Sequence, residues 1–321
     1  MGSWTVVGSG LTGAVIARYL HERGNKVTVL ESRGEVGGNV ADYQVDGTFI
    51  HRYGPHLFRT NSRRIWDYVN RFTTFTEYRH RVHTLAAGEI RPWPCAVSKP
   101  AFNGVPQNFE EACLAQMSEV SYRKFVKGYT EKQWGCDAKM LSVSLCKRIE
   151  PNDTGFLFPN HIYQGIPVWG YTSMMQNMLR GIEVKLNTPW DGTRGSNLVF
   201  TGGIDAYYSY DAGKLRYRSQ QRTLRPGGSF CAQLNYADAN EPRIRTISWR
   251  HITGGRSDLV TDETPQEGGE EYPFPDDENQ RLYQEYARRP TKAIICGRLG
   301  EYRYLDMDQA IGRALKICDS L

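Results

Sequence analysis

The chain has 321 residues, 40% hydrophobic and 23% charged, a composition that is typical of a folded protein with about two domains. Its net charge of +5 is modest and its basic residues are spread along the chain, which argues against nucleic acid as a partner and fits a phosphorylated small ligand. No apolar run reaches the roughly 18 residues of a membrane-spanning helix.

Neither the N-terminus nor the cysteines indicate an exported protein. The sequence starts directly with a strand pattern, so we expect no secretory signal. Its seven cysteines are scattered and form no CxxC pair, which argues against a disulfide framework and against a structural zinc site. We therefore expect a cytoplasmic protein that does not bind membranes.

The first seventy or so residues alternate between strand and helix patterns. Residues 4–7 and 26–30 are short apolar strands, and residues 12–23 between them have the apolar spacing of a helix. Residues 62–72 follow as an amphipathic helix that Ser62 could cap. The pattern predicts a βαβ unit with several glycines in the turn between the first strand and the helix.

A stretch rich in proline and glycine, residues 86–108, marks a boundary, and the pattern changes after it. The later elements that we expect are helices at 109–133 and 137–148, strands around 229–237 and 244–252, an acidic loop at 262–279, a buried strand at 292–299 and a C-terminal helix at 306–321. We find no internal repeat.

Gly8, Gly10 and Gly13 form a GxGxxG motif in the first turn, and Glu31 ends the second strand. The first glycine permits the tight turn, the second lets a pyrophosphate approach the backbone, and the third lets helix and strand pack closely. The helix N-terminus supplies N–H groups for the phosphates, and Glu31 can accept hydrogen bonds from an adenosine ribose. The sequence therefore predicts a dinucleotide site.

A second glycine stretch follows closely, GEVGGN at residues 34–39. Its glycines, Gly38 among them, and Asn39 suit a loop that lies over a bound pyrophosphate. Flavoproteins often carry such a second stretch and nicotinamide dehydrogenases usually do not, so the pattern favours FAD.

Further motifs are too specific to reflect composition: IHRYGPHLFRTN (50–61), KGYTEKQWG (127–135), KRI (147–149), YQGIPVWGYT (163–172) and GRLGEYRYLDM (297–307). In this order the sequence resembles the UDP-galactopyranose mutase family over most of its length, as a divergent short member. The resemblance implies an α/β fold with three parts, and it allows a homodimer. These parts are a discontinuous FAD/NAD(P)-type Rossmann domain (1–75, 195–228 and 290–321), a shortened helical domain (76–160) and an antiparallel substrate-binding sheet (161–194 and 229–289).

Members of this family are flavoproteins that interconvert the six- and five-membered ring forms of a nucleotide-linked sugar. The resemblance implies that reduced FAD attacks the anomeric carbon, that the nucleoside diphosphate leaves and returns, and that no net electron transfer occurs. It therefore implies a pyranose–furanose mutase of an NDP-hexose, with a nucleotide-diphosphate sugar as the partner.

The matched motifs also imply the site residues, and their side chains suit those roles. Arginine forks hold pyrophosphates, aromatic faces stack on bases at about 1–3 kcal/mol each, and a histidine can tune a flavin by hydrogen bonding. The catalytic residues that the resemblance implies are His56, Arg148, Arg245, Arg298, Tyr304 and Asp306. The cofactor-binding residues are the glycines above, Glu31, Asn39, Gly54, His56, Arg298 and Asp306. The substrate-binding residues are Tyr129, Trp134, Arg148, Tyr163, Arg245, Asp262, Tyr272 and Tyr304.

Departures from the family pattern gather near the substrate. The chain is some tens of residues short between Arg81 and Asn108. The single-residue departures are Arg59 for a histidine, Phe158 for a tyrosine, Glu271 for another aromatic residue and Cys296 for a glycine. Asp262 stands where an arginine typically reaches the diphosphate, and an anion there is repulsive unless a metal ion intervenes. We therefore expect a substrate other than UDP-galactose, with a GDP-linked or deoxy sugar as candidates.

Three alternatives stay open at the level of sequence. Asp262, the acidic segment 270–278 and the pair His80 and His83, whose spacing suits one helix face, could hold a divalent metal such as Mg²⁺ or Mn²⁺ that polarises the diphosphate without flavin. A non-catalytic nucleotide-sugar binder would account for the changed substrate positions. A flavin amine-oxidase-like redox enzyme shares the N-terminal pattern but does not explain KGYTEKQWG or the arginines.

Overall fold

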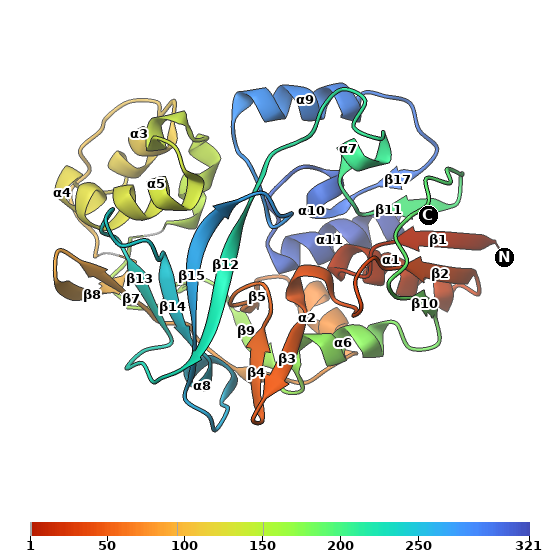
Figure 1. Cartoon of the computed structure of the whole chain (residues 1–321), viewed down its shortest axis with the longest axis horizontal. Helices are drawn as coiled ribbons and strands as arrows, with labels where there is room; N and C mark the ends of the chain where they lie inside the picture. The colour runs from red at the N-terminus through yellow and green to blue at the C-terminus, as the bar shows by residue number, and fades with distance from the viewer. Residues whose placement is uncertain (1, 95, 150) are drawn as a thin grey trace.

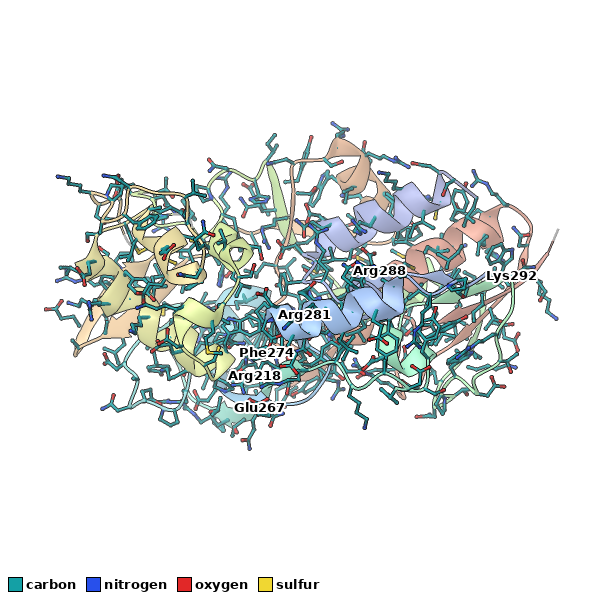
Figure 2. The ribbon with its side chains drawn as sticks, turned by 90° about the horizontal axis from the view of Figure 1, so that it is seen from above. Arg218, Glu267, Phe274, Arg281, Arg288 and Lys292 are labelled. Atoms are coloured by element: carbon teal, nitrogen blue, oxygen red, sulfur yellow. The ribbon has the colours of Figure 1, made fainter. Side chains whose placement is uncertain are left out.

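The computed structural model describes residues 2–94, 96–149 and 151–321, which form three regions (Figure 1). A parallel sheet lies at one end beside the chain termini, a larger sheet crosses the middle, and a cluster of short helices lies at the other end. Helix α9 (Asp277–Ala287), which carries Arg281, runs along the face that is seen from above in Figure 2.

The parallel sheet has the strand order β10–β2–β1–β11–β17. Its strands are β1 (Ser3–Val7), β2 (Lys26–Leu30), β10 (Glu183–Lys185), β11 (Leu198–Phe200) and β17 (Ile294–Ile295). Helices α1 (Leu11–Glu22) and α11 (Met307–Cys318) pack on each other beside it, so both ends of the chain share one core. This arrangement confirms the Rossmann-type fold class. Strand β10 differs from the expectation for 161–194, because Val184 packs on this core and the strand pairs in parallel with β2.

The larger sheet has the order β16–β12–β15–β14–β13–β7–β8 and is antiparallel except for the pair β13/β7. Its strands are β7 (Val82–Ala86), β8 (Glu89–Trp93), β12 (Tyr217–Pro226), β13 (Gln233–Tyr236), β14 (Arg245–Ser248), β15 (Leu259–Glu267) and β16 (Tyr272–Pro273). Strands β7 and β8 come from the range expected to be helical, and β12 from a range assigned to the dinucleotide domain. The loop expected at 262–279 is shorter than predicted, because β15 continues to Glu267, β16 occupies Tyr272–Pro273 and α9 begins at Asp277.

The helical cluster packs on one end of this sheet. Its elements are α3 (Phe109–Leu114), α4 (Glu119–Ser121), the π-helical turn η2 (Tyr122–Lys127), α5 (Gly128–Trp134) and the 3₁₀ turns η3 (Ala138–Met140) and η4 (Val143–Arg148). The helix expected at 109–133 is thus broken where Ser118 accepts a hydrogen bond from Ser121 N and restarts it as α4. Arg218 of β12 donates to the carbonyl oxygens of Gln133 and Lys132 and ion-pairs with Glu267, which fixes α5 to the sheet (Figure 2).

Smaller elements lie between these regions (Figure 1). They include the hairpin β3 (Asp42–Val45) and β4 (Thr48–His51) and a sheet of β5 (Phe58–Thr60), β9 (Tyr163–Pro167) and β6 (Phe75–Glu77). The remaining helices are η1 (Gly38–Val40), α2 (Arg63–Asn70), α6 (Gly170–Met178), α7 (Ile204–Tyr207), α8 (Trp249–Thr253) and α10 (Gly297–Gly300). In the part of the chain that the structure describes, no helix is long and apolar enough to cross a bilayer.

Candidate functional site

The first cavity, the dinucleotide pocket, has glycines from two stretches in its wall. Gly8 has φ +97°, and a Cβ there would lie 2.2 Å from Thr201 Oγ1. A Cβ on Gly13 would lie 2.0 Å from the Gly8 carbonyl oxygen, so packing requires both glycines. Gly38 lies against Gly10, because a Cβ on Gly38 would be 3.0 Å from Gly10 Cα. The GxGxxG turn and the second glycine stretch therefore form one continuous wall.

Glu31 and Arg33 follow β2 and add polar groups to this pocket. Glu31 is buried, and its Oε2 accepts hydrogen bonds from Ser9 N and Oγ at 2.9 and 2.6 Å. Arg33 Nη2 donates to Asn39 Oδ1 at 3.2 Å, whereas Arg33 Nη1 is buried without a hydrogen-bond partner among the described residues. Because an unpaired buried donor is costly, the pocket fits an anionic dinucleotide. Sequence reasoning missed Arg33, although a cation two residues after Glu31 was a readable signal.

His56 lines both the dinucleotide pocket and a second cavity, the middle pocket. Gly54 (φ +88°) makes the turn before it, and a Cβ there would lie 2.7 Å from Glu263 Oε1. His56 Nδ1 lies 2.8 Å from the Gly54 carbonyl oxygen, and because a carbonyl only accepts, Nδ1 carries the proton and Nε2 is an acceptor. Burial, and then the nearby charge of Arg298, lowers the pKa of His56 to about 3, so the ring is neutral at pH 7.

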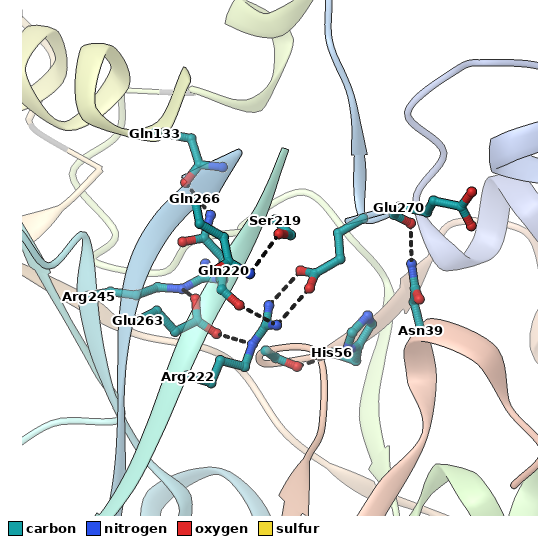
Figure 3. A network of polar contacts seen from close by, with 12 residues as sticks. Asn39, His56, Gln133, Ser219, Gln220, Arg222, Arg245, Glu263, Gln266 and Glu270 are labelled. Atoms are coloured by element: carbon teal, nitrogen blue, oxygen red, sulfur yellow. Dashed lines mark hydrogen bonds and ion pairs between the residues drawn. The ribbon is translucent and has the colours of Figure 1, made fainter. Parts of the chain in front are cut away.

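Four charged side chains form a chain of ion pairs beside the middle pocket, in the order Glu271, Arg222, Glu263, Arg245. Figure 3 labels the last three of them. Arg222 binds both oxygens of Glu271 at 2.8 and 2.7 Å, and its Nε donates to Glu263 Oε1 at 3.0 Å. Arg245 Nε donates to Glu263 Oε2 at 2.5 Å. Sequence reasoning identified Arg245 and missed Arg222 and Glu263. The role of Glu263 could be recognised only from the strand register, which places it opposite Arg245 in β14 and β15.

Arg298, Tyr272 and Tyr304 complete the middle pocket. Arg298 donates to the carbonyl oxygens of Glu271 and Leu305 at 3.0 and 2.7 Å, and its guanidinium lies 4.6 Å from the centre of the Tyr304 ring. Tyr272 and Tyr304 are stacked, with ring centres 6.1 Å apart and planes 4° from parallel. These hydrogen bonds leave the charge of Arg298 available to an anion, because carbonyl oxygens orient a guanidinium without neutralising it.

A third cavity, the aromatic pocket, lies against the helical cluster. Tyr129 and Trp134 from α5 both line it, and Trp134 packs edge-on against Tyr272 with ring centres 6.5 Å apart. Residues shared by the middle and aromatic pockets are Leu157, Phe158, Gln233, Arg245 and Tyr272. Residues shared by the dinucleotide and middle pockets are Asn39, His56, Arg298 and Met307. The three cavities therefore join in a row.

The structure corrects the expected position of Asp262. Its carboxylate accepts from Arg225 Nε at 2.7 Å and from Thr246 Oγ1 at 2.5 Å, and it lines none of the three pockets. Neighbouring residues on a strand face opposite sides, so Glu263 joins the ion-pair chain while Asp262 faces away from it. Because Arg225 pairs with Asp262, its negative charge needs no metal ion.

Asp306 lies at the middle pocket, where its Oδ2 accepts from Arg59 Nη2 at 2.8 Å. Tyr163 lies elsewhere: it stacks on Trp66, with ring centres 5.4 Å apart, and lines none of the three pockets. The prediction for the Arg148 side chain falls outside the described residues.

The two histidines considered for a metal site have neutral side chains as their described contacts. His80 is buried, with Nε2 at 3.2 Å from Gln233 Oε1 and Nδ1 at 2.9 Å from the Tyr78 hydroxyl. His83 lies on β7 and not on a helix, edge-on to Phe230. Within residues 2–94, 96–149 and 151–321, no group of three or more His, Cys, Asp or Glu side chains could hold a metal ion.

Two family models match the chain: UDP-galactopyranose mutase over residues 124–304, and an NAD(P)-binding Rossmann-like domain over residues 6–72. The chain is 31% identical to a probable UDP-galactopyranose mutase of Klebsiella pneumoniae, over 98% of this chain and 93% of that protein. It is 30% identical to the dTDP-fucopyranose mutase of Escherichia coli, over 97% and 96% of the two. A crystal structure of reduced UDP-galactopyranose mutase superposes with a TM-score of 0.76 at 14% identity, over 98% of this chain and 94% of that chain. A putrescine oxidase variant superposes with 0.65 at 13% identity, over 100% and 99%, and both superpositions concern the fold.

Proposed function

Because the chain belongs to the UDP-galactopyranose mutase family, we propose that it interconverts the pyranose and furanose forms of a nucleotide-linked hexose without net redox change. The observation that carries this proposal is the row of dinucleotide, middle and aromatic pockets. A cofactor, a sugar diphosphate and a base need such surroundings in that order, namely backbone N–H groups, fixed cations and aromatic faces.

FAD is the dinucleotide that we propose for the first pocket. The unpaired Nη1 of Arg33 and the glycine wall suit its pyrophosphate, and Glu31 suits its ribose. Reduced FAD, when bound, supplies a nucleophilic ring nitrogen. At the junction with the middle pocket, His56 offers Nε2 as a hydrogen-bond acceptor, and its low pKa keeps it from protonating a nucleophile at neutral pH.

The middle and aromatic pockets suit a nucleotide-sugar. Arg245 and Arg298 would hold the diphosphate as it leaves and returns, because guanidinium groups bind phosphate oxygens through paired N–H donors. Tyr129 and Trp134 would stack with the base. Phe158 offers no hydroxyl where the family pattern has a tyrosine, which favours a deoxy sugar and a substrate other than UDP-galactose.

The test is an interconversion assay with purified protein, FAD and dithionite, followed by chromatographic separation of the two ring forms. The panel contains UDP-galactose, dTDP-fucose and GDP-linked deoxy sugars. We expect conversion only with reduced FAD, and a higher kcat/KM for a deoxy sugar than for UDP-galactose. Binding without conversion would indicate a non-catalytic binder. Conversion that persists without FAD and stops with EDTA would indicate the metal-dependent reaction, and either outcome contradicts the proposal.

A further inference from the structure

Arg59 is a cation of the middle pocket to which the family motifs give no role. It is the central residue of β5, where Phe58 and Thr60 on either side are buried. Because side chains alternate along a strand, Arg59 points the other way and lines the middle pocket together with His56. The fold of β5 therefore directs this charge toward the site.

Two contacts orient the Arg59 side chain, which is 14% exposed. Nη2 donates to Asp306 Oδ2 at 2.8 Å, and the guanidinium carbon lies 3.7 Å from the centre of the Phe158 ring. The Nε atom is buried and has no hydrogen-bond partner among the described residues. A buried donor without an acceptor is costly, so this guanidinium is prepared for a ligand that accepts hydrogen bonds.

The balance of charge in the middle pocket depends on this residue. The charged residues that line the pocket, with their ion-pair partners, are Arg59, Arg222, Arg245, Arg298, Glu263, Glu271 and Asp306. Without Arg59 this set would be neutral, and it would attract the two negative charges of a diphosphate poorly. Asp308, two residues after Asp306, does not line this pocket.

We propose that Arg59 binds the diphosphate of the substrate and makes this chain selective for nucleoside diphosphates over monophosphates, an inference that rests on the proposed function. Arg59 and Phe158 both depart from the family pattern of histidine and tyrosine, and here the two replacements contact each other. A guanidinium is charged at any physiological pH, whereas a histidine is mostly neutral at pH 7. Phe158 supplies a ring face that orients the guanidinium and leaves its N–H groups for the phosphates.

The test is calorimetric titration of the FAD-loaded protein with UDP and dTDP, with UMP and dTMP as references. Arg59→Met removes the charge but leaves Asp306 unpaired beside the ligand, so it is also combined with Asp306→Asn. The double variant keeps the net charge of the pocket, because one cation and one anion are lost together, so it isolates the hydrogen bonds of Arg59. We expect it to bind diphosphates about 10- to 100-fold more weakly, the range for losing a charged hydrogen bond. Its monophosphate affinity should change less than about threefold, and Arg59→Lys should retain part of the diphosphate affinity.

The matched control is Arg281→Met on the exposed side of α9, which should leave all four affinities unchanged. Equal losses for monophosphates and diphosphates, or no loss, would overturn the inference and leave the mutase proposal standing. Unchanged diphosphate affinity with a shifted flavin midpoint potential would assign Arg59 to the cofactor and also overturn it. A wild-type protein that binds neither diphosphate would overturn the proposed function itself.

Discussion

The dinucleotide pocket and the middle pocket adjoin each other, but backbone shapes one wall of the first and side chains shape the second. Gly8, Gly10 and Gly38 shape the first pocket with backbone alone, and all three lie within the first forty residues. The second pocket is lined by long side chains from β5, β14 and the segments beside them. Ion pairs with Arg222 of β12 and Glu263 of β15 hold part of this lining in place (Figure 3). The difference shows that the glycine wall of the dinucleotide pocket is encoded locally, although residues from 188 to 310 complete that pocket, whereas the cations of the middle pocket are positioned by the pairing of distant strands.

The largest effect should come from filling the first pocket. A Cβ on Gly10 would have Gly38 Cα at 3.9 Å as its nearest neighbour, so Gly10→Val fills ligand space without a clash at Cβ. We expect FAD affinity, measured by fluorescence titration, to fall by at least about 100-fold, because the pyrophosphate must approach the backbone there. Gly195→Val, where a Cβ would meet nothing within 4 Å, is the control. Normal FAD binding by Gly10→Val would mean that the cofactor lies elsewhere.

The next effect should be on stability, through the ion pairs beside the second pocket. Glu263 is fully buried between Arg222 and Arg245, and breaking such an arrangement from one side typically costs about 3–5 kcal/mol. We expect Glu263→Ala to lower the free energy of unfolding in urea by that amount. Removing the exposed pair of Arg63 and Asp67 by Asp67→Ala should cost far less, because solvent screens such a pair. Equal losses would show that the ion pairs do not hold this pocket together.

Sequence patterns predicted the glycine wall of the first pocket, because the spacing of Gly8, Gly10 and Gly13 before a helix already defines that turn. Among the residues from 188 to 310 that complete the pocket, the motifs implied only Arg298. The second pocket was only partly predictable. The motifs gave Arg245, but the role of Glu263 depends on the register between β14 and β15, which no local pattern states. The position of Asp262 in a motif predicted a contact with the diphosphate. Neighbouring residues on a strand point to opposite faces, and Asp262 pairs with Arg225 on the face away from the pocket.

A smaller effect should appear on acidification. Burial lowers the pKa of His56 to about 3 and that of His80 to about 4, and it lowers the pKa of His51 as well. In the unfolded chain these histidines take up protons below about pH 6.5, whereas the folded protein keeps them neutral, so stability is complete above that pH and falls as the pH drops.

The histidine variant isolates this contribution. Between pH 6.5 and 5, one such histidine lowers the free energy of unfolding by about 1–2 kcal/mol. The decrease between these two pH values, measured by urea unfolding, should therefore be smaller by that amount in His56→Asn than in the wild type. His251→Gln, at an exposed position, is the control. Identical pH slopes for wild type and His56→Asn would show that His56 is not held neutral in the fold.

The smallest effect should come from Asp262, which the structure separates from the substrate. Asp262→Asn weakens a half-exposed pair with Arg225, so we expect UDP and dTDP affinities within about threefold of the wild type. Adding Mg²⁺ or EDTA should not change this result in calorimetry. If either affinity fell by more than about tenfold, Asp262 would have to contact the diphosphate, and the contrast between the two pockets would be weaker.

The most direct test of the central claim, that this row of pockets joins a flavin to a nucleotide-sugar without net redox change, is the flavin spectrum during turnover. Protein loaded with FAD is reduced with dithionite under anaerobic conditions and freed of excess reductant. It is then given excess dTDP-fucopyranose or UDP-galactopyranose while furanose product and absorbance at about 450 nm are followed together. We predict many turnovers per flavin while this absorbance stays low. Recovery of the absorbance in proportion to the sugar consumed would show that the flavin reduces the sugar, and it would contradict the account.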